Sequence, residues 1–387
     1  MRLSLNGTKE AAEELPFQPA SRDATSLHNK WRSSVFGPFW GIILILVGAP
    51  ILVRTLYLIG TVSKTHILSL NWALAFALTL LSVHGFVSLI ILFVLSQKNF
   101  FNEFIKKFLV TIKNKVPSGS PFRKAFVFTG LFAAFFFYSI IYYGVENVIM
   151  IEDLHFNVTN SSAKFRQSFL GAQEMFPVDM VIMIWGTFVS VTVLAMYNLC
   201  ANSIVGEYAK YNEELKEACK NGHLQHADLL TNYGARQLDF LELARFSNSH
   251  WDFLTTFTFL VGVLLHITAG FAFRGFGEEI SGFTKLVAVN FMLLSIFLLV
   301  MIMKRPGDIY NQAQDTKNTI LFERTIWNQC DEKLFNAANN IVNRILRADY
   351  VALAFHGFQI TEKFFHRTLP TLAIIIEILN LNKVHVP

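Results

Sequence analysis

The sequence contains little charge: only 16% of its 387 residues are Asp, Glu, Lys or Arg, whereas 53% are hydrophobic. Soluble domains carry about 25% charged residues, so a chain this apolar is typical of a protein that has lipid as its solvent. The basic residues form no cluster interleaved with aromatic ones, so nucleic-acid binding has no support. The composition therefore predicts an integral membrane protein.

Cysteine is also scarce, with Cys200, Cys219 and Cys330 as the full set. None of the three has metal-ligand spacing, so we interpret them as small apolar residues and expect no disulfide framework. His223 and His226 lie three residues apart but have no further ligands nearby in the sequence, which favours solvated side chains over a metal site. No Ser/His/Asp set, phosphate-binding glycine loop or paired carboxylates occur together, so the sequence predicts no enzyme and no cofactor.

Long apolar stretches are abundant instead. A helix needs about 20 mainly apolar residues to cross the hydrocarbon core, and seven candidate spans meet or approach this length. They are 35–60, 68–96, 125–150, 178–200, 253–273, 285–303 and 350–381. The seventh is interrupted by ionisable residues between 355 and 367, so we expect its short apolar end to continue a longer helix that begins in water. The sequence predicts an all-α, polytopic membrane protein with seven transmembrane helices.

The basic residues of the connecting segments predict the orientation of these spans. With the N-terminus inside, the inner segments are 1–34, 97–124, 201–249 and 304–349, and they hold 24 of the 33 Lys and Arg residues. The outer segments then hold 5. This asymmetry predicts a cytoplasmic N-terminus. The first 34 residues lack an apolar signal-peptide core, so we expect the first span to be retained as an anchor. Asn157 and Asn160 begin sequons in a predicted outer loop and are candidate glycosylation sites.

Two of the inner segments, 201–249 and 304–349, show the spacing of amphipathic helices. We expect them to extend the membrane helices into the cytoplasm. Their apolar faces are explained equally well by a subunit interface and by a helical hairpin that packs on itself. The predicted organisation of the chain is a tail (1–34), a six-helix ligand-binding bundle (35–303), anchor helices (304–349), and a seventh helix with a short outer tail (350–387).

Seven spans with a cytoplasmic N-terminus argue against a G-protein-coupled receptor, whose N-terminus is outside. The pattern resembles the insect gustatory and odorant receptor superfamily, most clearly near the C-terminus. In that family a glycine-aromatic segment precedes the last span. The last span itself ends in a motif of Thr-Tyr, then about five hydrophobic residues, then Gln-Phe. Here the chain has Phe-His-Gly-Phe at 355–358 and Thr371, with Leu372 in place of the Tyr and Glu377-Ile378 in place of Gln-Phe, one residue closer. The chain thus resembles a divergent member.

This resemblance implies a chemosensory receptor of the cell membrane, such as a taste receptor, that is a ligand-gated, non-selective cation channel opened by a small molecule. It also implies a homo- or heterotetramer of related subunits. The last span would line the pore, spans two to six would form a ligand pocket that opens outside, and the inner helices would hold the subunits together. Alternatives are a metabotropic seven-helix receptor, a non-conducting relative and a light- or peroxide-responsive relative. A transporter is disfavoured because no paired broken helices occur in matching halves.

The last apolar run contains the candidate pore residues. Glu377 is ionisable within this run, and four copies at a central axis would form a carboxylate ring that favours cations. Alternatively, Glu377 lies close enough to the outer surface to reach headgroup water and pair with Lys383. Pro370 removes a helical hydrogen bond just before the run and is a candidate hinge. The further candidates for the pore and its gate are Thr371, Ile374, Ile375 and Ile378; the helical period alone does not choose which of them face the pore.

The outer halves of spans two to six combine aromatic and polar residues that are suited to a small-molecule pocket. The candidates are Tyr142, Tyr143, Glu146, Trp185, His266 and Asn290. The alternative for the aromatic residues is that Trp and Tyr concentrate at membrane interfaces whatever the function. Glu146 and His266 are favoured, because polar groups at membrane depth need a reason.

Overall fold

The computed structural model describes residues 36–112, 119–154, 175–278, 280, 282–328, 331–347, 353–354, 358–359 and 362–383. The chain divides into two units, Met1–Leu46 and Val47–Pro387. Of the first unit the structure describes only the start of helix α2. Every contact reported below lies within the second unit, which carries the candidate sites.

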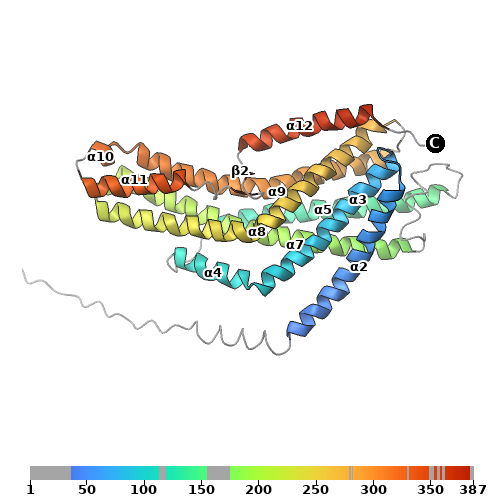
Figure 1. Ribbon diagram of the computed structural model, residues 1–387, viewed down its shortest axis with the longest axis horizontal. Coiled ribbons are helices and arrows are strands. Elements are labelled where there is room, and N and C mark those ends of the chain that lie inside the picture. The colour runs from blue at the N-terminus through green and yellow to red at the C-terminus, as the bar shows by residue number, and fades with distance from the viewer. Residues whose placement is uncertain are drawn as a thin grey trace, which may run out of the picture. The chain divides into compact units, whose positions relative to one another are not determined.

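The described part of the chain is almost entirely helical (Figure 1). Its first helices are α2 (Phe36–Lys64), α3 (Leu70–Gln97), α4 (Phe100–Thr111), α5 (Gly119–Leu154) and α7 (Phe176–Lys220). A short 3-10 turn, η3 (His223–Gln225), precedes α8 (Ala227–Gly275), α9 (Gly282–Leu321), α10 (Arg324–Asn328), α11 (Glu332–Leu346) and α12 (Glu362–Leu381). The described strands are β1 (Leu353–Ala354) and β2 (Phe358–Gln359), which pair antiparallel.

Six helices of the described part are long and apolar enough to cross a membrane. The candidate spans are Ile45–Lys64, Leu70–Gln97, Phe126–Val145, Pro177–Lys220, Ala227–Gly275 and Thr284–Leu321. The apolar part of α12, Pro370–Leu381, is shorter. The prediction of an all-α, multi-pass membrane protein is confirmed, and the first six predicted spans each fall within one of these helices or overlap it.

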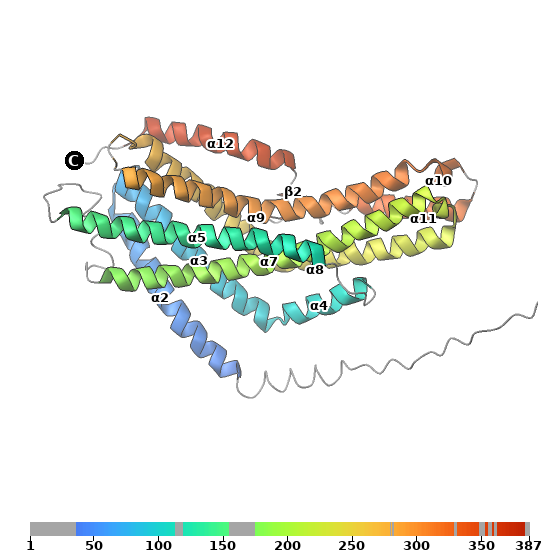
Figure 2. The ribbon, with the colours of Figure 1, turned by 180° about the vertical axis from the view of Figure 1, so that it is seen from behind.

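Three of the helices are much longer than a bilayer is thick. α7 has 45 residues, α8 has 49 and α9 has 40, so at about 1.5 Å per residue each is 60 Å long or more, against about 30 Å for the hydrocarbon core. The three run alongside one another in both views (Figures 1 and 2). The prediction that the membrane helices extend well beyond the bilayer is therefore confirmed.

The extensions form a second apolar core of their own. Tyr208 and Tyr211 of α7, Phe240 of α8 and Ile341 of α11 are at most 2% exposed. The rings of Tyr208 and Phe240 stack with their centroids 5.0 Å apart. Of the two alternatives for these apolar faces, packing within the chain therefore accounts for the residues in this core.

Polar contacts tie the same extensions together. The amide nitrogen of Asn212 on α7 donates to the side-chain oxygen of Gln312 on α9 over 2.8 Å, and the hydroxyl of Thr316 donates to the Asn212 side-chain oxygen over 2.6 Å. Near the end of α9, Glu323 accepts hydrogen bonds from the thiol of Cys219 and from Thr325. These bonds lower the pKa of Glu323, so its carboxylate stays charged and fixes the start of α10.

The segment before α12 differs from the prediction. The described residues of 350–361 form β1 and β2, with Leu353 opposite Gln359 and Ala354 opposite Phe358. The expectation of one interrupted helix over 350–381 was therefore wrong before Glu362, where α12 begins. This stretch is rich in β-branched and aromatic residues, which favour extended backbone, and the paired strands satisfy each other's backbone groups.

Helices α3 and α7 approach closely at a pair of glycines. A Cβ atom on Gly85 would lie 3.0 Å from the carbonyl oxygen of Gly186 and 3.1 Å from its Cα. We expect Gly85→Ala to lower the free energy of unfolding by about 1–3 kcal/mol, because overpacking forces two backbones apart. The measurement is the thermal midpoint of the purified protein in detergent. Gly60→Ala is the control, since no atom lies within 4 Å of its Cβ position; an equal loss in both variants would contradict the prediction.

Candidate pore helix and ligand pocket

Helix α12 has one packed face and one free face. Leu372 and Ile376 are 3% and 7% exposed, and they pack toward the bundle. Four exposed residues fall at the spacing i, i+3, i+7, i+10, which places them on a common side of a helix. They are Thr371, Ile374, Ile378 and Leu381. Ile375 is half-buried, at the edge between the two faces. Three of the predicted pore residues, Thr371, Ile374 and Ile378, thus lie on one exposed face, whereas Ile375 lies outside it.

Pro370 lies inside α12 without ending it. Its ring nitrogen has no proton to donate to the carbonyl four residues earlier. The hydroxyl of the next residue, Thr371, donates to the backbone carbonyl of Arg367 over 2.9 Å. The helix therefore has a locally weakened backbone at the predicted hinge, and it is continuous there in this structure.

Glu377 is paired, and its partner is a residue that the sequence analysis did not consider. Its Oε1 lies 3.1 Å from Nε of Arg274 on α8, and the two side chains are 57% and 62% exposed. Lys383 instead donates from Nζ to the backbone oxygen of Gly275 over 2.7 Å. The expected alternative of a Glu377–Lys383 pair was therefore wrong. The Glu377 carboxylate is therefore accompanied by the Arg274 guanidinium group.

The candidate pocket residues of α5, α8 and α9 are buried in the bundle. Tyr143 is 3% exposed, and its ring centroid lies 6.3 Å from that of Phe291 on α9. Nδ1 of His266 on α8 lies 2.8 Å from Oγ of Ser295, whose hydroxyl donates to the backbone oxygen of Met292 over 2.6 Å. Because that hydroxyl proton is already used, His266 is the donor through Nδ1.

Asn290, beside Phe291, has an unused hydrogen-bond donor. The side chain is 5% exposed, and its amide nitrogen has no hydrogen-bond partner among the residues that the structure describes. Such a group is costly to bury unless a ligand or water meets it. Tyr143, His266 and Asn290 are thus all buried in the bundle, and the Asn290 amide keeps a donor that no described residue uses.

The other predicted pocket residues lie elsewhere or are not described. Trp185 is 47% exposed, and its ring lies beside that of Phe188 on the same helix, which is also exposed. Tyr142 is half-buried, with its ring near that of Tyr138. Glu146 lies in α5, but its side chain is outside the description. The sequons at Asn157 and Asn160 also lie outside the described residues.

The sequence analysis missed a buried histidine that joins three membrane helices. Nδ1 of His84 on α3 lies 3.0 Å from Oγ of Ser190 on α7, and its Nε2 lies 3.0 Å from Oγ1 of Thr258 on α8. His84 is 1% exposed. An ionisable residue in the middle of a predicted span was the available signal. Both ring nitrogens are occupied, so His84 acts as a fixed link between helices.

A buried ion pair was also missed. Nε of Arg54 on α2 lies 2.6 Å from Oδ1 of Asp179 on α7, and the two side chains are 1% and 0% exposed. The Arg54 guanidinium also contacts Sδ of Met183. The second oxygen of Asp179 has no hydrogen-bond partner in the described part of the chain. The signal was again a charge within each of two apolar stretches.

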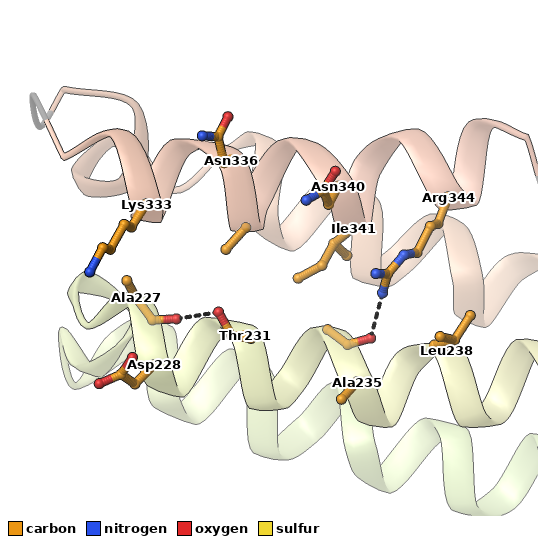
Figure 3. A pocket seen from close by; sticks show the side chains of 12 residues that line it. Ala227, Asp228, Thr231, Ala235, Leu238, Lys333, Asn336, Asn340, Ile341 and Arg344 are labelled. Carbon is orange, nitrogen blue, oxygen red and sulfur yellow. Dashed lines mark hydrogen bonds between the residues drawn. The ribbon is translucent and has the colours of Figure 1, made fainter.

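A groove lies between α8 and α11, in the extensions. Its lining residues include Lys333, Asn336 and Asn340 of α11 and Asp228 and Thr231 of α8. Figure 3 shows Lys333, Ile341 and Arg344 extending from α11 toward α8. The Arg344 guanidinium at one end donates to the backbone oxygen of Gly234 over 3.1 Å. None of the predicted pocket residues lines this groove.

Comparison of this chain with known proteins identifies the family to which its sequence belongs and a solved structure with a similar fold. The family model described as "Caenorhabditis protein of unknown function, DUF267" matches residues 20–373. No curated protein matches the chain in sequence. Among solved structures, the insect olfactory receptor OR5 from Machilis hrabei is similar with a TM-score of 0.67 and 10% identity, over 94% of this chain and 92% of that chain. The same receptor in complex with eugenol gives the same values. At 10% identity, this likeness shows the fold.

Proposed function

The chain belongs to the family described as "Caenorhabditis protein of unknown function, DUF267", and we propose that it is a chemosensory receptor that conducts cations when a small molecule binds. The observation that carries the proposal is the fold, which is shared over nearly the full length of both chains with an olfactory receptor. The eugenol complex of that receptor supports a small organic molecule as the ligand class here.

In this proposal, the free face of α12 lines a central pore in a tetramer. A single chain leaves Ile374, Ile378 and Leu381 at 62%, 54% and 85% exposure. Large apolar side chains on one stripe of a helix are suited to a constriction that closes by excluding water. Thr371 lies on the same stripe toward the other end. The burial of Leu372 and Ile376 on the opposite face, with Ile376 against Gly270 of α8, supports this choice of face.

Imaging the purified full-length protein in lipid nanodiscs tests the assembly without knowledge of the ligand. We expect a four-fold symmetric particle in which α12 is the helix closest to the axis, with Ile374 and Ile378 facing it. Monomeric particles, or α12 on the periphery, would rule out the channel proposal.

The charge at the outer end of α12 gives a paired prediction for ion selectivity. We expect Glu377→Gln to lower the cation-to-anion permeability ratio about sevenfold, and Arg274→Gln to raise it by a similar factor. One unit charge at about 7 Å in water-like surroundings changes the energies of a cation and of an anion by roughly RT each, in opposite directions, so the difference between them changes by about 2RT. The measurement is the reversal potential under a salt gradient in cells that express the chain. Unchanged ratios in both variants would remove the pair from the conduction path.

For the ligand pocket, we propose that Tyr143, His266 and Asn290 contact the small molecule. The buried, unpartnered amide nitrogen of Asn290 supports a ligand that carries a hydrogen-bond acceptor. The rings of Tyr143 and Phe291 supply apolar contact area, as is typical of small-molecule sites. Trp185 is left out of this set because it lies on an exposed face.

The orientation remains a prediction and has a direct test. An epitope tag at the N-terminus should be reachable by antibody only after the cell is permeabilised, whereas a tag at the C-terminus should be reachable on intact cells. A tag at the N-terminus that is labelled on intact cells would favour a metabotropic receptor instead.

A further inference from the structure

The attachment of α12 to the bundle is narrow, and its main contact is with the last turns of α8. A Cβ atom added to Gly270 would lie 2.5 Å from Cδ1 and 3.2 Å from Cγ1 of Ile376. Ile376 therefore occupies the space that a side chain on α8 would otherwise fill. Among the α12 residues whose side chains are described, the buried ones are Leu372 and Ile376, at 3% and 7% exposure.

The space above Gly270 that Ile376 fills, here called the notch, is important for holding α12 in place because the helices are surrounded by lipid. In a bilayer, moving an isoleucine from lipid to protein gains little hydrophobic free energy, since lipid tails are as apolar as the side chain. Helices associate there through close van der Waals packing, which small residues permit. A side chain at position 270 would force Ile376 to shift and would loosen this close contact between α12 and α8.

Polar contacts complete the attachment one turn further along. Arg274 and Glu377 form an ion pair, but both are more than half exposed, so the pair is weak. Lys383 donates to the backbone oxygen of Gly275, at the end of α8, where carbonyls lack helical partners. The attachment thus combines one close apolar contact with one exposed ion pair and one partly buried hydrogen bond, a combination suited to release.

Helix α8 also carries the candidate ligand contact nearest to this attachment. His266 precedes Gly270 by four residues, which places both on one side of the helix. His266 is held through Ser295 on α9. A change at the pocket that rotates or shifts α8 therefore acts directly on the residues that hold α12.

We propose that Gly270 and Arg274 are positioning residues for α12: the Gly270–Ile376 contact and the Arg274–Glu377 pair hold α12 on α8 in the closed channel and separate when it opens. We refer to these two contacts as the α8–α12 clasp. The proposal rests on the proposed channel function and adds the element that regulates it. Ligand binding releases the clasp through α8, and α12 then turns about its own axis, which carries Ile374 and Ile378 away from the pore axis and exposes its packed face.

The test follows the exposure of a buried position on α12 that lies outside the clasp. Leu372→Cys is placed in the full-length protein in cells, and its reaction with a neutral, membrane-impermeant maleimide is followed by mass spectrometry of the peptide that contains it. Intact and permeabilised cells are both treated. We expect slow labelling in the otherwise unchanged chain, because this position is buried at 3% exposure.

Added clasp variants should accelerate this reaction. We expect Gly270→Ala to raise the labelling rate about tenfold, the factor that moderate overpacking supports. Arg274→Gln should raise it about two- to fivefold, as expected for loss of an exposed ion pair. Exchanging the charges with Arg274→Glu and Glu377→Arg should restore the slow rate. Gly130→Ala is the matched control, because no atom lies within 4 Å of that Cβ position on α5.

Equal labelling rates in all variants, or an exchanged pair that stays as fast as Arg274→Gln, would overturn the clasp. Arg274→Gln keeps the test decisive if Gly270→Ala fails to fold, since its side chain is exposed. Ionic current from the same cells reports separately on the proposed function. If labelling rises as expected but no variant carries current, the clasp is supported and the channel proposal is wrong. If the cells carry current but labelling is unchanged in the variants, the channel proposal is supported and the clasp is wrong.

Discussion

Arg54→Ala should remove most of the folded protein, with a loss of about 3–5 kcal/mol in the free energy of unfolding. The substitution leaves the Asp179 carboxylate buried at 0% exposure without its cation, and one of its oxygens already has no partner among the described residues. An unpaired buried charge is among the most costly defects that a point mutation creates. The measurement is the thermal midpoint and the recovery of monodisperse protein by fluorescence-detected size-exclusion chromatography.

Two controls separate the buried charge from the loss of a side chain. Arg274→Ala breaks an ion pair of the same chemistry that is more than half exposed, and it should cost less than about 1 kcal/mol. The double variant Arg54→Leu with Asp179→Leu should recover much of the stability, since apolar residues replace buried pairs at little cost. A double variant as unstable as Arg54→Ala would show that the charges themselves are required.

Trp251→Ala should cost about 3–5 kcal/mol, the usual range for removing a large buried aromatic side chain. Trp251 on α8 is 1% exposed. Its ring meets that of Phe100 on α4 edge-on at 5.4 Å and that of Tyr197 on α7 at 5.8 Å. The substitution therefore opens a cavity where three helices meet. The thermal midpoint in detergent is again the measurement.

Trp251→Phe is the matched variant for this site. The indole nitrogen has no hydrogen-bond partner in the described part of the chain, so removing it leaves no new unsatisfied group. Phenylalanine keeps an aromatic ring in the cavity, and we expect a loss below about 1.5 kcal/mol. Equal losses for alanine and phenylalanine would contradict the packing argument and point to a role for the indole N–H.

The membrane helices and their long extensions were predictable because their determinants are local. The length of an apolar run identifies a span, and the 3.6-residue period of leucines and tyrosines continues past residue 200 and past residue 304. The start of the last helix was less predictable. At 350–361 the apolar content suggested a span, whereas β-branched and aromatic residues there support the pairing of β1 with β2.

The candidate site was predictable only in part. Glu377, His266 and Asn290 were selected as candidates because polar groups in apolar helices are conspicuous and need partners, and their roles stay predictions. The same rule applied to Arg54 and His84 would have found two further buried contacts. Trp185 was selected as a pocket residue and lies on an exposed face, because interfacial and pocket-lining tryptophans have the same sequence context.

The sequence by itself determined that this chain is an integral membrane protein, that it is helical, and which of its helices are longer than the bilayer is thick. These three properties depend on composition and on the spacing of neighbouring residues. Only the tertiary structure decided which groups meet. Arg54 and Asp179 are 125 positions apart, Arg274 and Glu377 are 103 apart, and the notch at Gly270 exists only where Ile376 fills it. The rotation of α12, and with it the face that stays exposed, follows from those contacts, because they decide which side of the helix a neighbour covers.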